Sequence, residues 1–222
     1  MTKKIAIFDL DNTLLGGDSD HLWGQFLIEK GIVDGDVYQR ENDRFYQEYV
    51  DGTLDIHEFL SFSLQPLSSN PLSQLHEWRS EYLKEKIEPI LLQDATALLQ
   101  QHRDDGATLL IITATNRFIT EPIAAMLGVE HLLATEPEII NNAYTGKIID
   151  PPCFQHGKVE RLEVWLKQTG LNLAESWFYS DSHNDLPLLE RVTQPVAVDP
   201  DDTLLQHAEA KGWPIISLRG KS

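Results

Sequence analysis

The feature that most constrains this chain is a pair of acids, Asp9 and Asp11, placed directly after a short apolar run. The run, residues 5–8 (Ile-Ala-Ile-Phe), is typical of a strand that is buried on both faces. No Lys or Arg falls between Lys4 and Lys30, so nothing nearby in the sequence neutralises the two carboxylates. Carboxylates at the end of a buried strand are costly unless a cation approaches them from elsewhere in the fold. The sequence therefore predicts that a distant cation reaches this strand end.

The composition limits which kinds of molecule the protein is expected to bind. The chain has 222 residues, 41% of them hydrophobic, which is enough for a core domain with a smaller appendage. Its formal net charge of −17 disfavours nucleic acid and anionic membrane surfaces. The single cysteine, Cys153, excludes an internal disulfide, and the eight histidines lack the spacing of a zinc site. No stretch reaches the ~18 apolar residues of a membrane span. We expect a cytoplasmic protein that acts on a small molecule, as a monomer or a homodimer.

The order of apolar patterns predicts two kinds of structure. After the first strand, residues such as Trp23 and Phe26 recur at helical spacing, and no convincing strand interrupts them. Further on, amphipathic helices alternate with continuous apolar strands, for example residues 108–113 and 177–180. This alternation predicts an α/β fold, a Rossmann-like doubly wound parallel sheet with helices on both faces. We expect a core of residues 1–17 and 88–222, with an α-helical cap of residues 18–87 inserted after the first strand.

Polar residues follow three of the predicted strands, where the reactive groups of a parallel sheet lie. Thr113 ends the second strand, Asp181 and Asp185 follow the third, and Lys158 lies near the start of the helix before that third strand. If these strands neighbour the first, four carboxylates, a hydroxyl and a lysine meet at one edge of the sheet. Carboxylate oxygens suit Mg²⁺, a hard cation that also binds substrate phosphate. The sequence therefore predicts a magnesium and phosphate site.

Each of these residues taken alone has an ordinary structural explanation. An acidic pair after a strand often caps a turn or a helix, and a threonine at a strand end often bonds to backbone. Lys158 alone would be a solvated helix residue, and residues 180–185 would make a good N-cap for the following helix. The site prediction therefore depends on the whole set and on its order along the chain.

The same four segments resemble the four motifs of the haloacid dehalogenase superfamily. They are Asp-Leu-Asp-Asn-Thr at residues 9–13, Thr113, Lys158, and Ser-Asp-Ser-His-Asn-Asp at residues 180–185. All four occur in the family's order and on elements of the expected type. The helical insert resembles the family's first (C1) type of cap, which places the chain beside phosphoserine phosphatase in subfamily IB.

The resemblance implies a Mg²⁺-dependent phosphomonoesterase that forms an aspartyl-phosphate. Asp9 matches the nucleophile and Asp11 the general acid and base. An acid at position 11 also favours a phosphatase, because dehalogenases and ion pumps of the superfamily lack it. Thr113 and Lys158 match phosphate-binding residues. The implied metal ligands are Asp9, the backbone carbonyl of Asp11, Asp181, and Asp185 directly or through water.

Residues beyond the motifs indicate the substrate. Phosphoserine phosphatases carry a glutamate nine residues after the nucleophile that binds the substrate ammonium, and Asp18 holds that position here. Their cap also carries an arginine that binds the substrate carboxylate, and in the matching stretch, residues 55–63, Ser63 replaces it. Serine cannot copy a bidentate arginine–carboxylate contact. We therefore expect an amino alcohol phosphate without a carboxylate, and histidinol phosphate is the best candidate.

Residues 17–24 also resemble a bacterial branch of this subfamily that includes histidinol-phosphate phosphatases. Asp18 and Asp20 are candidates to bind ammonium and imidazolium, and Trp23 or Phe62 to stack on the ring. The acids would serve equally as helix N-caps, and the aromatics as core residues of the cap. The remaining candidate contacts to substrate are the amides of Ala114 and Thr115 and the side chain of Asn184.

Three other functions stay open on the sequence alone. Phosphoserine hydrolysis is the first, and phosphoryl transfer, as in mutases with a similar cap, is the second. The third is non-catalytic phosphate binding, which the intact Asp9 and Asp11 disfavour, because a binder needs no paired acids.

Overall fold

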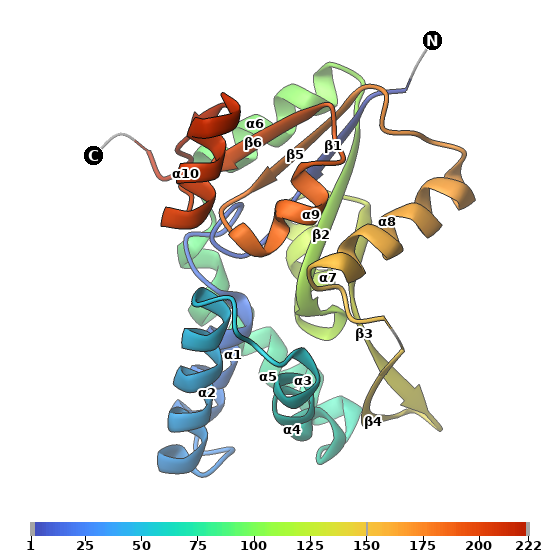
Figure 1. Ribbon diagram of the computed structural model, residues 1–222. Coiled ribbons are helices and arrows are strands. Elements are labelled where there is room, and N and C mark those ends of the chain that lie inside the picture. Colours follow the sequence, from blue (N-terminus) through green and yellow to red (C-terminus); the bar gives the residue numbers. More distant parts are fainter. Residues whose placement is uncertain (1–2, 150, 221–222) are drawn as a thin grey trace.

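The apolar run at residues 5–8 forms the central strand of a seven-stranded sheet (Figure 1). This is a computed structural model that describes residues 3–149 and 151–220. The strands lie in the order β4-β3-β2-β1-β5-β6-β7. All neighbours are parallel except the β3–β4 pair, which is an antiparallel hairpin. Their bounds are β1 Ile5–Phe8, β2 Thr108–Asn116, β3 His131–Ile140, β4 Ala143–Ile149, β5 Ser176–Ser180, β6 Gln194–Val198 and β7 Ile215–Ile216.

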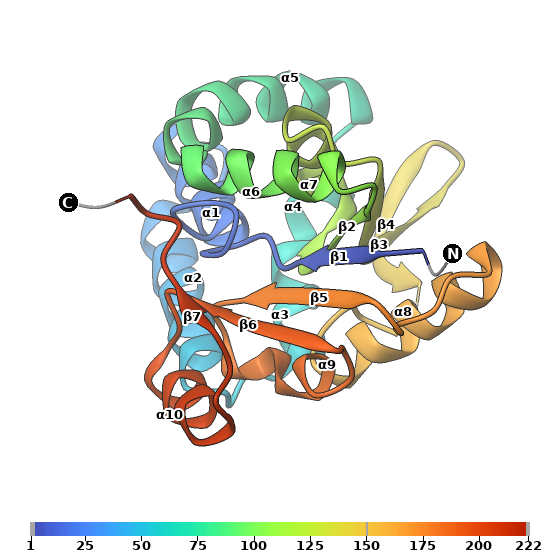
Figure 2. The same cartoon turned by 90° about the horizontal axis from the view of Figure 1, so that it is seen from above.

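Helices cover both faces of the sheet, as Figure 2 shows. One face carries α6 (Gln93–Asp104) and α7 (Arg117–Met126), and the other carries α8 (His156–Thr169), α9 (Leu186–Leu189) and α10 (Asp202–Lys211). Alternate side chains of β1 enter the two resulting cores, Ala6 and Phe8 on one side and Ile5 and Ile7 on the other. A strand that is apolar on both faces therefore fits the middle of a doubly wound sheet, and the predicted fold is confirmed.

The insert between β1 and α6 is helical throughout, and its helices lie beyond the carboxyl end of β1 (Figure 1). Side chains of Asp18, Asp34 and Asp55 accept backbone N–H bonds and so begin three of these helices. The bounds 18–87 for a separate cap domain stay a prediction. The helices are α1 Ser19–Glu29, α2 Gly35–Val50, α3 Ile56–Ser63, α4 Gln65–Ser68 and α5 Leu72–Tyr82, followed by a π-turn at Leu83–Ile87 and a 3₁₀ turn at Glu88–Ile90.

Aromatic side chains join the helical insert to the core. Trp23 packs against Phe26, Tyr82 and Phe118, the last of which comes from α7 of the core. Tyr82 also donates a hydrogen bond of 2.6 Å to the carbonyl oxygen of Ser19. None of the helices within the described ranges has the length and apolar character needed to cross a membrane.

Candidate active site

The sheet order brings the predicted strand ends together. β1 lies between β2 and β5, and Phe8 is paired in register with Ile111 on one side and Tyr179 on the other. Asp9 therefore follows β1 close to Thr113 of β2 and to Asp181, which directly follows β5. The second strand does not end at Thr113 as expected but continues to Asn116. The neighbour relation that the sequence prediction needed is confirmed.

Lys158 is the distant cation that reaches Asp9. Its Nζ lies 2.7 Å from Asp9 Oδ1 and 2.7 Å from Asp185 Oδ1, and the lysine is only 2% exposed. Burial alone would lower the pKa of Lys158, but the charges of Asp185 and Asp9 raise it above its ordinary value. Burial raises the pKa of Asp9 to about 7, against the opposing charge of Lys158. This ion pair explains how the fold accommodates Asp9, one of the two acids that follow the first strand.

Asp11 is held by hydrogen bonds rather than by a cation. Its Oδ1 accepts from the backbone N–H of Ser19 at 2.6 Å, and its Oδ2 accepts from Thr115 Oγ1 at 2.9 Å and Thr113 Oγ1 at 3.4 Å. Burial raises the pKa of Asp11 in spite of these bonds. A carboxyl group with a raised pKa holds its proton to higher pH than usual, which suits it to protonate a leaving group.

Asp181 has the chemistry of a metal ligand. Its Oδ1 accepts from Thr13 Oγ1 at 3.0 Å, while burial and then the charges of Asp9 and Asp185 raise its pKa well above the usual range. No three His, Cys, Asp or Glu side chains in the described part of the chain form a ready-made metal cluster. Lys158 accounts for this in part, because it lies between Asp9 and Asp185. Buried carboxylates that lack a full complement of cations nevertheless fit a hard divalent ion.

A pocket opens between these strand ends and the helical insert. Its core side consists of Asp9, Asp11, Thr113, Ala114 and Thr115. Its helical side is acidic near α1 and aromatic near α2 and α3, and the residues are Asp18, Asp20, His21, Asn42, Phe45, Tyr46, Tyr49, Leu54, Ile56 and Phe59. Within the part of the chain that the structure covers, no Lys or Arg lines this pocket.

The two acids of the α1 turn play different structural parts. Asp18 is the N-cap of α1, since its Oδ1 accepts from the N–H groups of Asp20 and His21 at 2.9 and 2.8 Å. Asp20 is 9% exposed, and its hydrogen-bond partner is the neutral amide of Asn116, at 3.3 Å. Burial, followed by neighbouring acids, raises the pKa of both carboxyl groups, to about 7 for Asp18. Both acids line the pocket, so capping and substrate binding do not exclude each other.

Three expectations need correction. Trp23 is 2% exposed and packs in the core, so the expectation that it stacks on substrate is wrong. Phe62 does not line the pocket either: it is half-buried and packs against Tyr38 and against Phe45, which lies between it and the pocket side of the insert. Asn184 does not line the pocket either. Its amide instead bonds the backbone of α2 and the side chain of Gln155.

Several pocket residues were not predicted from the sequence. His21, Asn42, Tyr46 and Tyr49 line the pocket, and the last three recur at positions i, i+4 and i+7 of α2. That spacing marks one helix face and was the available signal, but a polar and aromatic face is also typical of ordinary packing. Thr13 and Ser180 were missed as well: Ser180 Oγ donates to Asp185 Oδ2 at 2.7 Å.

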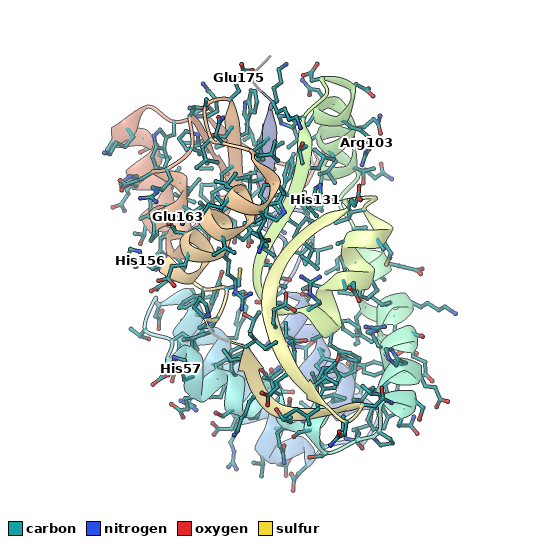
Figure 3. All side chains as sticks on the ribbon, turned by 90° about the vertical axis from the view of Figure 1, so that its right-hand side faces the viewer. His57, Arg103, His131, His156, Glu163 and Glu175 are labelled. Atoms are coloured by element: carbon teal, nitrogen blue, oxygen red, sulfur yellow. The ribbon has the colours of Figure 1, made fainter. Side chains whose placement is uncertain are left out.

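The histidines do not gather at a common site. Figure 3 shows His57 on the helical insert, His131 on β3 and His156 on α8, well separated on this side of the molecule. This agrees with the scattered spacing in the sequence.

Acids, hydroxyls and a lysine at the strand ends, beneath a set of helices, are the arrangement of a phosphatase. A profile of the haloacid dehalogenase-like hydrolases matches residues 6–190, and the chain belongs to that family. A histidinol-phosphatase from Neisseria meningitidis serogroup C (strain 8013) is 42% identical over 221 residues, which cover 98% of this chain and 100% of that one. The similarity to this relative and the family membership together make the protein a phosphatase.

Solved structures support the same fold. A protein of unknown function from Bordetella pertussis Tohama I has a TM-score of 0.93 and 42% identity, covering 98% of this chain and 100% of that one. A substrate-bound phosphoserine phosphatase complex has a TM-score of 0.73 at 17% identity, covering 100% of this chain and 95% of that one. The second similarity concerns the fold alone.

Proposed function

We propose that this protein hydrolyses histidinol phosphate, with Mg²⁺ and through an aspartyl-phosphate on Asp9. The observation that carries the choice of substrate is the charge of the pocket. Asp18 and Asp20 line it, and no described Lys or Arg does. The relative from Neisseria meningitidis that is named histidinol-phosphatase supports the same choice.

Electrostatics separate the two leading substrates. The carboxylate of phosphoserine would enter a pocket whose charged side chains are acids, and like charges at close range disfavour binding. Histidinol phosphate instead offers an ammonium group and an imidazole. Asp20, with a single neutral partner, is placed to pair with a cation, and Tyr46 and Phe59 offer aromatic faces to a ring. Ser63 is buried and does not line the pocket, so it adds no carboxylate contact.

The chain's own residues can carry out each proton transfer that hydrolysis needs. A carboxylate oxygen of Asp9 forms a bond to phosphorus while the ester oxygen leaves and takes a proton from Asp11. Asp11 then removes a proton from the water that cleaves the aspartyl-phosphate. Lys158 offsets the charge of Asp9, and Thr113 with the amide of Ala114 donates to phosphate oxygens, whereas the Thr115 amide donates to Thr113 Oγ1 and so orients that hydroxyl.

The residues that would hold Mg²⁺ are Asp9, Asp181, the backbone carbonyl of Asp11, and Asp185 directly or through water. The ion would supply positive charge to the phosphoryl oxygens. The cytoplasmic location and the monomeric or dimeric state remain predictions.

A comparison of three esters tests the substrate. We expect kcat/KM for histidinol phosphate to exceed that for phosphoserine by more than about tenfold, with phosphoethanolamine, which has the ammonium but neither ring nor carboxylate, in between. A higher value for phosphoserine would show that the charge argument is wrong. Steady release of inorganic phosphate distinguishes a hydrolase from a phosphotransferase, which would pass the group to an acceptor.

A further inference from the structure

The loop that carries Asp181 and Asp185 also contacts the carboxyl end of α2. Asn184 Nδ2 donates to the carbonyl oxygen of Tyr49 at 3.0 Å. Its Oδ1 accepts from Gln155 Nε2 at 3.0 Å, so both ends of the amide are engaged and its orientation is fixed. The core is therefore hydrogen-bonded to the backbone of α2 at Tyr49, a residue that lines the pocket.

His183 makes a second contact with the helical insert, at Gly52, which is about one helical turn after Tyr49. Its backbone N–H and its ring Nδ1 both meet Asp201 Oδ2, at 2.7 and 2.8 Å, which holds the ring in place. The opposite ring atom, Nε2, lies against Gly52, where φ is +70°. A Cβ at position 52 would lie 2.5 Å from that nitrogen. Only glycine satisfies both the backbone angle and the contact.

The rest of the helical insert is attached to the core in a different way. One continuous hydrophobic cluster contains side chains from α1, α3, α4 and α5 together with side chains from α6 and α7, and examples are Trp23, Leu60, Leu67, Leu75, Leu99 and Ile119. Strand β4 of the β3–β4 hairpin adds to this, since Gly146 packs against Ser68 of α4. Residues 46–55 contribute no member to that cluster. Segments with few buried apolar contacts open at the lowest free energy.

We propose that His183 and Asn184 are positioning residues that hold residues 46–55 as one wall of the pocket, and that this segment opens to admit the ester while the rest of the helical insert stays fixed to the core. The segment carries Tyr46, Tyr49 and Leu54, which line the pocket. The loop that presents Asp181 and Asp185 thus also closes the pocket over the leaving group. This inference requires only phosphatase activity and is independent of which ester is the natural substrate.

A disulfide between the insert and the hairpin tests which part moves. A Cβ built on Gly146 lies 3.3 Å from Ser68 Cβ, slightly below the ~3.5–4.5 Å range of disulfides, so Ser68→Cys with Gly146→Cys brings two thiols within cross-linking reach. Because φ at Gly146 is +79°, the cysteine strains the backbone there, and the reduced double variant, which carries the same strain, is the reference for the oxidised one. With p-nitrophenyl phosphate, we expect the oxidised double variant to keep kcat/KM within about twofold of the same protein after reduction, because the linked elements do not need to move. A tenfold loss that reduction reverses would overturn the proposal, since it would mean that the whole insert swings. The native Cys153 is buried and serves as an internal check in thiol counts.

Two glycines with similar backbone angles test the positioning role. Gly52→Ala should raise KM and lower kcat/KM about tenfold, because the competent, closed form becomes less populated. Adding His183→Ala should recover part of that loss, since it removes the ring that meets the new Cβ. Gly31→Ala is the matched control: its φ is +66°, and a Cβ there meets nothing within 4 Å. Equal activity in the Gly52→Ala and Gly31→Ala variants would overturn the proposal, and it does so whether or not the disulfide forms.

Discussion

Lys158 neutralises only part of the charge at the strand ends. It pairs with Asp9 and Asp185, whereas Asp11 and Asp181 are held by hydroxyl and amide donors. Four carboxylates, of which Asp181 is partly exposed, therefore face one buried ammonium group, and desolvation raises the pKa of three of them, namely Asp9, Asp11 and Asp181. An excess of this kind is stable only if protons or a metal ion complete it. A cation bound there would lower the pKa of Asp9 and so keep it ionised, as a nucleophile must be.

Asp9→Asn should abolish turnover without unfolding the protein. The amide has the shape of the carboxylate but cannot form the aspartyl-phosphate, an acyl phosphate, so we expect kcat to fall by at least about 10³-fold. The circular dichroism spectrum and the thermal midpoint serve as the control for folding. Appreciable residual turnover in a protein free of wild-type contamination would rule out the covalent mechanism.

Asp18→Asn should change the pH dependence of stability. Burial and the charge of Asp11 raise the pKa of Asp18 to about 7 from its ordinary 3.8, so between these values the folded protein holds a proton that the unfolded chain releases. Stability from this group is therefore lost as pH rises through that window. Asparagine keeps the N-cap of α1 and removes the titration.

Urea unfolding in the presence of a chelator measures this effect. We expect the Asp18→Asn variant to exceed the wild type by on the order of 1 kcal/mol at about pH 8, and the difference to vanish towards about pH 4. A difference that is the same at both pH values would show that the carboxyl group titrates normally in the fold.

At the scale of helices, α1 and α2 cross at a position that admits no side chain. A Cβ on Gly24 of α1 would lie 2.6 Å from Oδ1 of Asn42, which is 6% exposed on α2. Asn42 Nδ2 in turn donates to the carbonyl oxygen of His21 at 3.1 Å. This crossing sets the distance between the acidic and the aromatic sides of the pocket.

Gly24→Ala should destabilise the protein although alanine favours a helix. We expect a loss of about 1–3 kcal/mol from overpacking against Asn42, larger than the roughly 1 kcal/mol gained in helix propensity. Gly35→Ala is the matched control, because a Cβ on that residue, at the start of α2, meets Ile28 at an ordinary 3.5 Å. Chemical denaturation of both variants makes the comparison, and a Gly24→Ala protein as stable as Gly35→Ala would contradict it.

The strand pattern carried far more information than the helix pattern. A run such as residues 5–8 is apolar at every position, which fixes both its burial and the sheet edge where Asp9 lies. The helices of the insert were recognisable as helices, but periodicity does not say what covers a buried face. Trp23 and Asp20 are both buried on α1, yet one packs in the core and the other lines the pocket. Their different roles follow only from how α1 packs, because its Trp23 side faces α5 and α7 and its Asp20 side faces the pocket.

At the scale of the whole molecule, the net charge of −17 and the acidic site make stability dependent on cations. Any salt screens the general repulsion between surface carboxylates, so NaCl should stabilise the protein modestly. Mg²⁺ bound at the strand ends, as we propose, would act in addition by mass action, because it would bind the folded site and not the unfolded chain. At a hundredfold excess over its Kd this contributes about 2.7 kcal/mol, which is several degrees in Tm for a chain of this size.

Asp181→Asn separates these two contributions. The amide oxygen can still accept from Thr13, so the loop keeps its hydrogen bond, but the variant loses a charged ligand for the ion. In thermal unfolding at matched ionic strength, we expect Mg²⁺ to raise the Tm of the wild type beyond the effect of NaCl. The variant should keep the increase in Tm that NaCl causes and lose the additional increase that Mg²⁺ causes in the wild type. If the variant gained as much from Mg²⁺ as the wild type, the ion would bind away from the strand ends, and Asp9 and Asp11 would need another cation.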